Sequence, residues 1–409
     1  MISYRKNYDA VVAGAGVAGV AASLELARAG LNIALVEKNV MLGGLATAGF
    51  VHCYLPLCDG EGTQASFGIA EELLHATCRY GIGRIPPDWR QSTRTQPAGR
   101  YMVTFSPAAF ALALDELVAR EPGIDLWYDT LVCAAAINNG RITAIEVENK
   151  SGRGVLAAPV FIDTTGDGDV ARRAGCAFVE EGNKLTIWAM EASLADARHA
   201  TEKSDGTRLC HASKIGLMGD RLDPATKLRE HPWRGTDGKS VSRFIAETHA
   251  ALLRHYAALQ TRGGDSSREN CYPLVLPAMA QFRTTRAITG RATLAGGMEG
   301  RRFEDSIALA ADWRRRGGVL EIPYGTMIPE TVAGLIVAGR CISSTGDAWE
   351  ITRSIGPSAQ TGQVAGLAAT LAFRSNTTPG DLAVAEIQSA LREKGMPCHF
   401  EEARSLIRM

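Results

Sequence analysis

The chain has 409 residues, of which 46% are hydrophobic and 22% are charged, which is the composition of a folded protein large enough for about two or three domains. Lysine plus arginine and aspartate plus glutamate both total 44, so the formal net charge is zero. A nucleic acid or an anionic membrane surface as the main partner would require an excess of basic residues, and the balance therefore argues against both.

The N-terminal stretch is typical of a strand, a turn, a helix and a second strand. Residues 10–13 form a short apolar run, as in a buried parallel strand, and residues 14–19 have the sequence Gly-Ala-Gly-Val-Ala-Gly. A helical pattern follows over residues 20–29, and residues 32–36 form a second apolar run. This order of elements is that of the first βαβ unit of a dinucleotide-binding fold.

The glycines of this turn and the acid after the second strand have distinct expected tasks. Gly14 permits a tight turn, Gly16 lets backbone N–H groups approach a pyrophosphate, and Gly19 lets the helix pack closely on the strand. The positive end of the helix dipole would then face the phosphates. Glu37, at the carboxyl end of the second strand, is placed to accept hydrogen bonds from ribose hydroxyls.

The next segments alternate loops and helices. A glycine-rich loop over residues 41–49 precedes an irregular stretch and an amphipathic helix over residues 69–78. Residues 84–100 form a polar loop, which we interpret either as a solvated loop or as a lid over an anionic substrate. Ser106 and Pro107 are typical of the N-cap and the first position of a helix. The arginines of the polar loop are Arg84, Arg90, Arg94 and Arg100.

Beyond this helix the pattern predicts a three-stranded antiparallel meander. Its strands are expected at about residues 125–137, 141–148 and 155–162. Asn139 and Gly140 stand between the first two, and Asn-Gly between alternating strands is the strongest short hairpin signal.

Residues 179–300 change character and are interpreted as a separate domain. Its helices are expected over residues 244–259 and 279–294. A short strand over residues 335–338 and a long helix over residues 362–373 then return to the earlier alternation.

The cysteines and the first apolar stretch give information on the cellular location of the protein. The nine cysteines are scattered without C-x-x-C pairs, and neither they nor the eight histidines show a metal-site spacing, so no metal is expected. The first apolar stretch contains Asp9 and several glycines, and a nucleotide-binding strand and helix explain it better than a signal sequence. No run reaches the length of a membrane span. We therefore expect reduced thiols and a cytoplasmic location.

Segments that carry glycine recur where parallel strands are expected to end. They are residues 14–19, 43–49, 163–169 and 339–366. In an open α/β sheet, ligands bind at the carboxyl ends of the strands. A nicotinamide dinucleotide would need mainly the first segment, whereas a flavin dinucleotide is longer and buried and needs glycine at several strand ends. The pattern favours FAD, and a nicotinamide-only dehydrogenase is kept as an alternative.

An ordered set of motifs runs along nearly the whole chain, to about residue 396. After the N-terminal glycines and Glu37, the motifs are GGLATAG at 43–49, VENKSG at 147–152, FIDTTGDGD at 161–169, QFRTTR at 281–286, GRRFEDS at 300–306, IPY at 322–324, AGRCIS at 338–343 and GQVAG at 362–366. Together they resemble the FAD-dependent oxidoreductase family of the two-dinucleotide-binding-domain flavoprotein superfamily, which is distantly similar to fumarate reductase flavoprotein subunits.

The resemblance implies an α/β fold with a glutathione-reductase-like FAD-binding Rossmann domain and an inserted α+β substrate domain. The FAD-binding domain would have two parts, residues 1–178 and 318–375, the first including the meander at about 125–162. Residues 179–317 would form the substrate domain, and residues 376–409 a C-terminal helix and tail.

The resemblance also assigns site residues. The flavin side would lie against Gly44 and Ala46, and Gly166 and Asp167 would approach the cofactor. The helix that starts near Gly362 would direct its N-terminus at the isoalloxazine, where reduced flavin carries negative charge. The candidate cofactor-binding residues are Gly14, Gly16, Ala18, Gly19, Glu37, Lys38, Gly44, Leu45, Ala46, Thr47, Val132, Gly166, Asp167, Gly339, Arg340, Gly356, Gly362 and Gln363.

Two positions depart from the family pattern on the substrate face of the flavin. Gly346, followed by Asp347, stands where many relatives carry a histidine. The proline before the last helix is one place late, at Pro357. The substrate is therefore not inferred by analogy.

Three residues are candidate catalytic groups. Arg353 is placed either to hold a carboxylate or carbonyl oxygen or to form a structural ion pair with Glu350 or Asp347. His52 and Tyr54 follow the glycine-rich loop and are placed either at the reactive face of the flavin or in the packed interior.

Another arginine pair and a cysteine pair leave alternatives open. Arg283 and Arg286 match the family pattern, although two nearby arginines often brace a domain interface. Cys53 and Cys58 resemble the redox pair of flavin disulfide reductases, although Cys53 lies far beyond the double glycine and Pro56 interrupts the spacing.

We therefore expect an FAD-dependent oxidoreductase that transfers a hydride between a small organic substrate and flavin N5. The remaining alternatives are a flavin-dependent disulfide reductase that uses Cys53 and Cys58 and a flavin-binding protein without turnover. The expected partner is a small-molecule substrate, and self-association into a homo-oligomer stays open.

Overall fold

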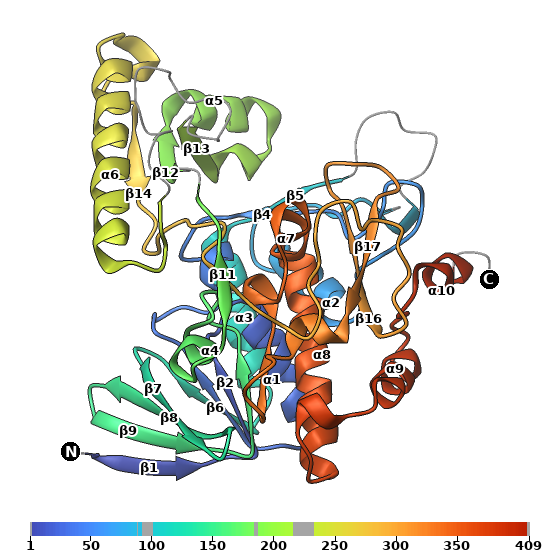
Figure 1. The fold of residues 1–409 in the computed structure, drawn as a ribbon. Helices are drawn as coiled ribbons and strands as arrows, with labels where there is room; N and C mark the ends of the chain where they lie inside the picture. Colours follow the sequence, from blue (N-terminus) through green and yellow to red (C-terminus); the bar gives the residue numbers. More distant parts are fainter. Residues whose placement is uncertain (1, 88, 92–100, 184–186, 216–232, 407–409) are drawn as a thin grey trace.

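The computed structural model describes residues 2–87, 89–91, 101–183, 187–215 and 233–406. The strands of its central sheet are β2 (Ala10–Ala13), β3 (Ile33–Val36), β6 (Ile124–Trp127), β10 (Val160–Asp163) and β18 (Leu335–Val337). They lie in the order β18-β10-β2-β3-β6, and every neighbouring pair is parallel (Figure 1). Apart from β6, these strands are fully buried, because layers of structure cover both faces of the sheet.

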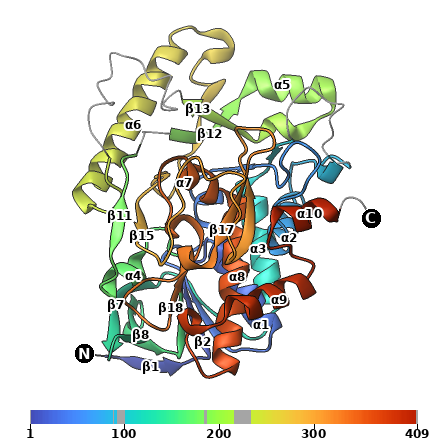
Figure 2. The same cartoon turned by 45° about the vertical axis from the view of Figure 1, so that its right-hand side comes forward.

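Helices cover one face of the sheet. α1 (Val17–Arg28) directly follows the turn after β2 and packs along α8 (Ile355–Arg374) (Figures 1 and 2). The two helix backbones come very close at Gly362, where an added Cβ would lie 2.1 Å from the carbonyl oxygen of Ala18. The layer also contains α2 (Ile69–Thr77) and α3 (Pro107–Ala119).

The start of α8 differs from the expected start near Gly362. Its N-cap is Ser354, and Pro357 lies in its first turn, where proline loses no intrahelical hydrogen bond. The two earlier helices agree with the sequence. α2 covers the expected residues 69–78 apart from the last, and the hydroxyl of Ser106 accepts a hydrogen bond from the N–H of Ala109 at 3.3 Å as the N-cap of α3.

A four-stranded sheet in the order β1-β9-β8-β7 covers the other face. Its strands are β1 (Tyr4–Asn7), β7 (Leu131–Asn138), β8 (Arg141–Asn149) and β9 (Gly152–Ala157). Because successive strand residues point to opposite faces, β2 buries Val11 and Ala13 toward this sheet and the alternate residues toward the helices. The main body thus has three layers.

The predicted meander is correct for its central hairpin and wrong at both ends. Asn139 and Gly140 form the turn between β7 and β8 with φ of 48° and 75°, the left-handed conformations that favour Asn-Gly there. The first expected strand is divided near Asp129, so its initial part is β6 of the central sheet. The third is divided near Pro159, so its final part is β10, because the chain crosses between sheets there.

A smaller group of elements stands above the three layers in Figures 1 and 2. It contains a three-stranded antiparallel sheet in the order β13-β12-β14, α5 and α6, with a core of its own around Trp233, Phe244 and Phe282. The bounds are β12 (Ile187–Ser193), α5 (Leu194–Lys203), β13 (His211–Ile215), α6 (Gly238–Gln260) and β14 (Cys271–Val275).

One of the two helices expected in this region is present. α6 includes the predicted residues 244–259, but the helix predicted over residues 279–294 is wrong. Within that stretch β15 (Arg286–Ile288) pairs antiparallel with β11 (Phe178–Glu180). Tertiary pairing, together with hydrogen bonds from the Gln281 amide to other segments, overrides the helical pattern.

The C-terminal third returns to the main body. β16 (Ser306–Ala311) and β17 (Val319–Pro323) form an antiparallel hairpin that packs on α8, so the predicted boundary at 317/318 falls inside one hairpin. The expected C-terminal helix and tail contain two helices among the described residues, α9 (Val384–Glu393) and α10 (Phe400–Ser405). The division into domains remains a prediction.

The remaining α-helices and strands are α4 (Asp169–Arg173), α7 (Gly346–Thr352), β4 (Cys53–Tyr54) and β5 (Val103–Thr104).

Candidate active site

A cavity of about 430 Å³ lies at the carboxyl ends of the parallel strands. Its lining includes residues that directly follow four of them: Gly14 after β2, Glu37 after β3, Thr164 after β10 and Ala338 after β18. A cavity of this size is in the range of sites for small molecules and cofactors. The glycine-bearing segments of the sequence therefore meet at one place.

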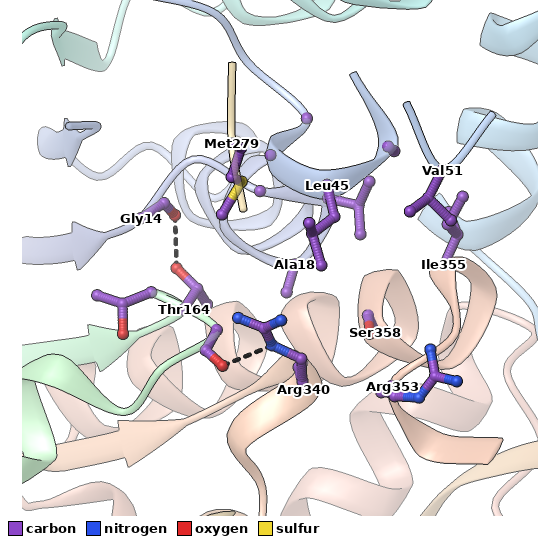
Figure 3. A pocket seen from close by; sticks show the side chains of 18 of the residues that line it. Gly14, Ala18, Leu45, Val51, Thr164, Met279, Arg340, Arg353, Ile355 and Ser358 are labelled. Carbon is purple, nitrogen blue, oxygen red and sulfur yellow. Dashed lines mark hydrogen bonds between the residues drawn. The ribbon is translucent and has the colours of Figure 1, made fainter. Parts of the chain in front are cut away.

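The first glycine motif forms the floor of the cavity and the start of α1. Gly14 has φ of +96°, and its carbonyl oxygen accepts a hydrogen bond from the Thr164 hydroxyl at 2.7 Å (Figure 3). An added Cβ on Gly19 would lie 1.8 Å from the Gly14 oxygen, so Gly19 permits packing. Gly16 is different: an added Cβ would have no neighbour within 4 Å, which means that it would project into open space of the cavity.

The helix that begins at Gly16 leaves its first N–H groups available. Gly16 is the N-cap of α1, and no side chain caps this end of the helix. Val17 and Ala18 of the first turn line the cavity. Uncapped N–H groups and the helix dipole together make such an end a binding site for phosphate groups.

Buried Asp163 shapes the loop that follows β10. Its carboxylate accepts hydrogen bonds from the N–H and hydroxyl of Thr165, at 3.0 and 2.7 Å, and from the N–H of Ala171 at 2.9 Å. Burial raises the pKa of Asp163 to about 6, although these hydrogen bonds favour the anion. The loop brings Thr164, Thr165 and Gly166 to the cavity wall.

Glu37 and Lys38 mark one end of the cavity. The Glu37 carboxylate is 5% exposed and accepts hydrogen bonds from the N–H of Ala15 at 2.7 Å and of Asn39 at 2.9 Å. It is thus held against the first glycine motif. Val132 of β7 completes this end.

Asp167 acts as a link between charged groups. Its carboxylate lies 2.6 Å from Nη2 of Arg340 and 3.6 Å from Nζ of Lys38. Nε of Arg340 donates to the carbonyl oxygen of Gly166 at 2.7 Å (Figure 3). Arg340 lines the cavity and Asp167 does not; Asp167 pairs with Arg340 and Lys38, and its predicted approach to the cofactor stays a prediction.

The other end of the cavity is apolar and faces the start of α8. Leu45 and Val51 lie on one side, with Ile355 and Ser358 of α8 on the other (Figure 3). No side chain caps this end of α8 either, and its N-cap Ser354 also lines the cavity. A second helix N-terminus is therefore directed at the cavity, seven residues earlier than Gly362.

Arg353 lies beside this second helix end. Its guanidinium forms an ion pair with Glu350, its side chain is 19% exposed, and its Nε is buried with no hydrogen-bond partner among the described residues. Burial lowers the pKa of Arg353, opposed by Glu350 and assisted by the nearby charges of Arg283 and Arg340. Arg353 thus forms the ion pair with Glu350 and also lines the cavity, and its role in holding a substrate stays a prediction.

Two candidate catalytic residues lie in the packed interior. Tyr54 is fully buried, and its hydroxyl donates to the carbonyl oxygen of Ala70 at 2.5 Å; burial raises the pKa of this phenol well above its usual value. His52 is buried with its ring edge-on to Trp188, the ring centroids 5.6 Å apart. Neither lines the cavity, and a role at the reactive face stays a prediction for both.

Several candidate cofactor residues also have structural positions instead. The Gln363 amide accepts from the N–H of Ile69 at 2.8 Å and donates to Glu25 at 3.0 Å, and an added Cβ on Gly356 would lie 2.6 Å from the Leu57 side chain. They lie outside the cavity lining because they hold helices and loops together. The residues in this group are Gly19, Thr47, Gly356, Gly362 and Gln363, whereas the candidates that line the cavity are Gly14, Gly16, Ala18, Glu37, Lys38, Gly44, Leu45, Ala46, Val132, Gly166, Gly339 and Arg340.

The lining also contains residues that the sequence did not identify. Ser354 and Ser358 would have been found by placing the helix start at Ser354, a residue type that favours the N-cap. No local sequence pattern predicts a cavity position for Trp188, Trp313 or Met102, because these residues reach the cavity from separate segments. Of the two family-matched arginines, Arg283 lines the cavity, whereas Arg286 pairs with Asp169 at 3.1 Å.

The other sequence hypotheses have mixed outcomes. Residues 92–100 of the polar loop lie outside the described residues, so its role as a lid stays a prediction.

In the described part of the chain, no group of His, Cys, Asp and Glu could hold a metal ion, and no helix is both long and apolar enough to cross a membrane. All nine cysteines lie among the described residues, and none of them forms a disulfide. Cys53 lines the cavity, and the buried Cys58 thiol donates to the carbonyl oxygen of Trp89 at 3.2 Å.

The family of the chain follows from a family model described as FAD dependent oxidoreductase. The model matches residues 9–212 and 195–391, so this chain belongs to the FAD-dependent oxidoreductase family. It is accordingly an FAD-binding enzyme with a flavin redox function.

Individual relatives are similar over limited parts. The tRNA uridine 5-carboxymethylaminomethyl modification enzyme MnmG of Chlorobaculum tepidum is 29% identical over 161 residues, 38% of this chain and 24% of that protein. A thioredoxin reductase of Ureaplasma parvum is 37% identical over 68 residues, 17% of this chain and 22% of that protein. The matched part of the chain thus spans about a quarter of either relative. A geranylgeranyl bacteriochlorophyll reductase-like structure from Thermoplasma acidophilum has a TM-score of 0.47 at 12% identity, over 95% of this chain and 84% of that one.

The residues of the cavity fit a flavin dinucleotide. Open space at Gly16, the two uncapped helix ends and the carboxylate of Glu37 lie along one cavity. A dinucleotide with an anionic centre and a polar ribose requires these groups, and its apolar ring suits the end with Leu45 and Ile355.

Proposed function

We propose that this enzyme transfers a hydride between a small organic substrate and N5 of FAD, with the substrate bound at the Arg353 end of the cavity. The observation that carries the proposal is the convergence of two uncapped helix ends on one cavity, which is also lined by Arg353 with its buried Nε. When bound, FAD supplies the acceptor or donor of the hydride.

The chain's own groups would then divide the work. The N–H groups at the start of α1 bind the pyrophosphate beside Gly16, and Glu37 accepts hydrogen bonds from the ribose hydroxyls. The start of α8, at Ser354, stabilises negative charge on the reduced ring. Leu45 and Val51 help to exclude water from the reacting atoms.

Arg353 is proposed to orient the substrate by its carboxylate or carbonyl oxygen, because its guanidinium has a buried Nε beside the cavity that finds no hydrogen-bond partner in the described part of the chain. We expect Arg353→Lys to leave FAD bound and to slow flavin reduction by the substrate by roughly 10²-fold, the scale of one lost electrostatic contact. Anaerobic stopped-flow reduction, beside a measurement of flavin content, tests this.

Glu350→Gln provides the matched control for Arg353. This change removes the ion-pair partner and keeps the guanidinium, so the reduction rate should fall much less than in Arg353→Lys. An unchanged rate in Arg353→Lys, with only a small loss of stability, would assign Arg353 to the structural ion pair.

The disulfide reductase is the second candidate, since Cys53 does line the cavity. The Cys58 thiol, however, donates a hydrogen bond to the carbonyl oxygen of Trp89 and does not line the cavity. We expect a Cys53→Ser, Cys58→Ser double variant to keep substrate-driven flavin reduction at nearly the original rate. Complete loss of reduction with flavin still bound would favour the disulfide mechanism instead.

A further inference from the structure

The mouth of the cavity carries large apolar side chains that face solvent. The Trp313 side chain is 40% exposed and that of Met102 is 53% exposed, and both line the cavity together with Trp188. Tryptophan and methionine at the rim of a cavity favour contact with an apolar or aromatic partner. Neither packing in the core nor the ion pairs of the site explain these two exposed side chains.

Trp313 is held in place on both sides. Its neighbour Arg314 forms two hydrogen bonds, at 3.0 and 3.2 Å, with the fully buried carboxylate of Asp312. A third, at 3.0 Å, joins Arg314 to Asp347 in the first turn of α7. On the other side, the N–H of Gly317 donates to the carbonyl oxygen of Asp59 at 2.8 Å. Hydrogen bonds of Arg314 and Gly317 therefore hold this loop, and none of them involves the Trp313 indole.

The short helix α7 connects the loop of Trp313 to Arg353. α7 carries Asp347, the anchor of the Trp313 loop, in its first turn, and Arg353 is its C-cap. A helix of seven residues is about 10 Å long. Arg314 thus ties the Trp313 loop to the first turn of this helix, Arg353 stands at its other end, and Trp313 and Arg353 both line the cavity.

Guanidinium groups lie near the start of α8, beside the apolar side chains of that end of the cavity, and favour an anion there. Arg283, Arg340 and Arg353 line the cavity, and Arg283 and Arg340 lie near enough to Arg353 for their charges to act on it. The acids of the same lining are Glu37, Asp169 and Glu350. Arg340 is paired with Asp167 and Arg353 with Glu350, yet Arg353 keeps a buried Nε without a partner among the described residues. A carboxylate that accepts from Nε would also relieve the mutual repulsion of the guanidinium groups.

We propose that the substrate is a carboxylate with an aromatic or alicyclic body, bound with its carboxylate at Arg353 and its ring against Trp313. This inference rests on the proposed function and specifies its substrate class. Trp313 is accordingly a specificity-determining residue, and a short dicarboxylate without an apolar body would leave it uncovered.

The test uses the purified holoenzyme and three probes: 3-phenylpropionate, its uncharged amide, and succinate. Perturbation of the flavin absorption spectrum reports binding at equilibrium, without turnover. We expect the Kd of 3-phenylpropionate to be at least about tenfold lower than that of the amide or of succinate. Trp313→Ala should raise the Kd of 3-phenylpropionate about tenfold, since it removes one large apolar contact, and should leave FAD content unchanged.

Phe373→Ala provides the matched control. Phe373 is an aromatic side chain near the C-terminal end of α8 with 37% exposure, close to that of Trp313, and it does not line the cavity. This variant should bind all three probes as the original protein does. Equal binding of succinate or of the amide, no spectral change with 3-phenylpropionate, an unaffected Kd in Trp313→Ala, or loss of FAD from that variant would each overturn the substrate class.

Failure of the substrate class and failure of hydride transfer are distinguishable. The titration needs no reduction of flavin, so an unfavourable result there leaves hydride transfer intact. Hydride transfer fails instead if dithionite reduces the bound flavin anaerobically and no organic donor, charged or neutral, does so.

Discussion

Gly16→Val is expected to remove FAD from the protein while leaving the apoprotein folded. The φ of Gly16 is −64°, which valine can adopt, and its added side chain would meet no protein atom at the Cβ position. It would instead occupy the open space beside the start of α1, where the pyrophosphate must approach. Flavin content after gel filtration should fall to a few per cent of the original, and the thermal midpoint should fall with it because bound FAD stabilises the native state.

Gly238→Val is the control for this change. Gly238 begins α6, its added Cβ would also have no neighbour within 4 Å, and it does not line the cavity. This variant should keep its flavin. Full FAD occupancy in Gly16→Val would contradict the assignment of the first glycine motif to the pyrophosphate.

Gly362→Ala is expected to destabilise the fold itself. The added methyl group would lie 2.1 Å from the carbonyl oxygen of Ala18, so α1 and α8 would have to separate. The expected loss is about 3 kcal/mol of unfolding free energy, the upper end for overpacking, although alanine is the better helix former by about 1 kcal/mol. Denaturant unfolding of the apoprotein measures this loss directly.

The apoprotein is needed because it separates packing from cofactor binding. Gly238→Ala, at an open position, should leave the unfolding free energy nearly unchanged. If Gly362→Ala lowered FAD occupancy and left the apoprotein as stable as before, Gly362 would belong to the cofactor site, as the sequence motif suggests.

The sequence predicted the parts of the site that follow from local rules. A short apolar strand followed by glycines at fixed spacing leaves few alternatives to a tight turn and a helix start, and Gly14, Gly16 and Glu37 all line the cavity. Their roles toward the pyrophosphate and the ribose stay predictions. The Asn139-Gly140 hairpin was predicted for the same reason, since both residues require positive φ.

The remainder depends on contacts between distant segments. Trp313 lies in a loop that Arg314 connects to α7 and that Gly317 connects to Asp59, and no pattern near residue 313 predicts these hydrogen bonds. Gly362 was assigned to the flavin because motif position does not distinguish a glycine that faces a ligand from one that faces a helix. The sequence also does not show the hydrogen bond from Tyr54 to Ala70, because it depends on how β4 meets α2.

The absorption spectrum of the purified protein, followed by identification of the cofactor released on denaturation, tests the central claim most directly. Because the start of α1 and Glu37 bind the pyrophosphate and adenosine halves in this account, the protein should be yellow and should release FAD and not FMN. Anaerobic addition of a hydride donor of the substrate class should then bleach the flavin band. A colourless protein that FAD cannot reconstitute would contradict the account.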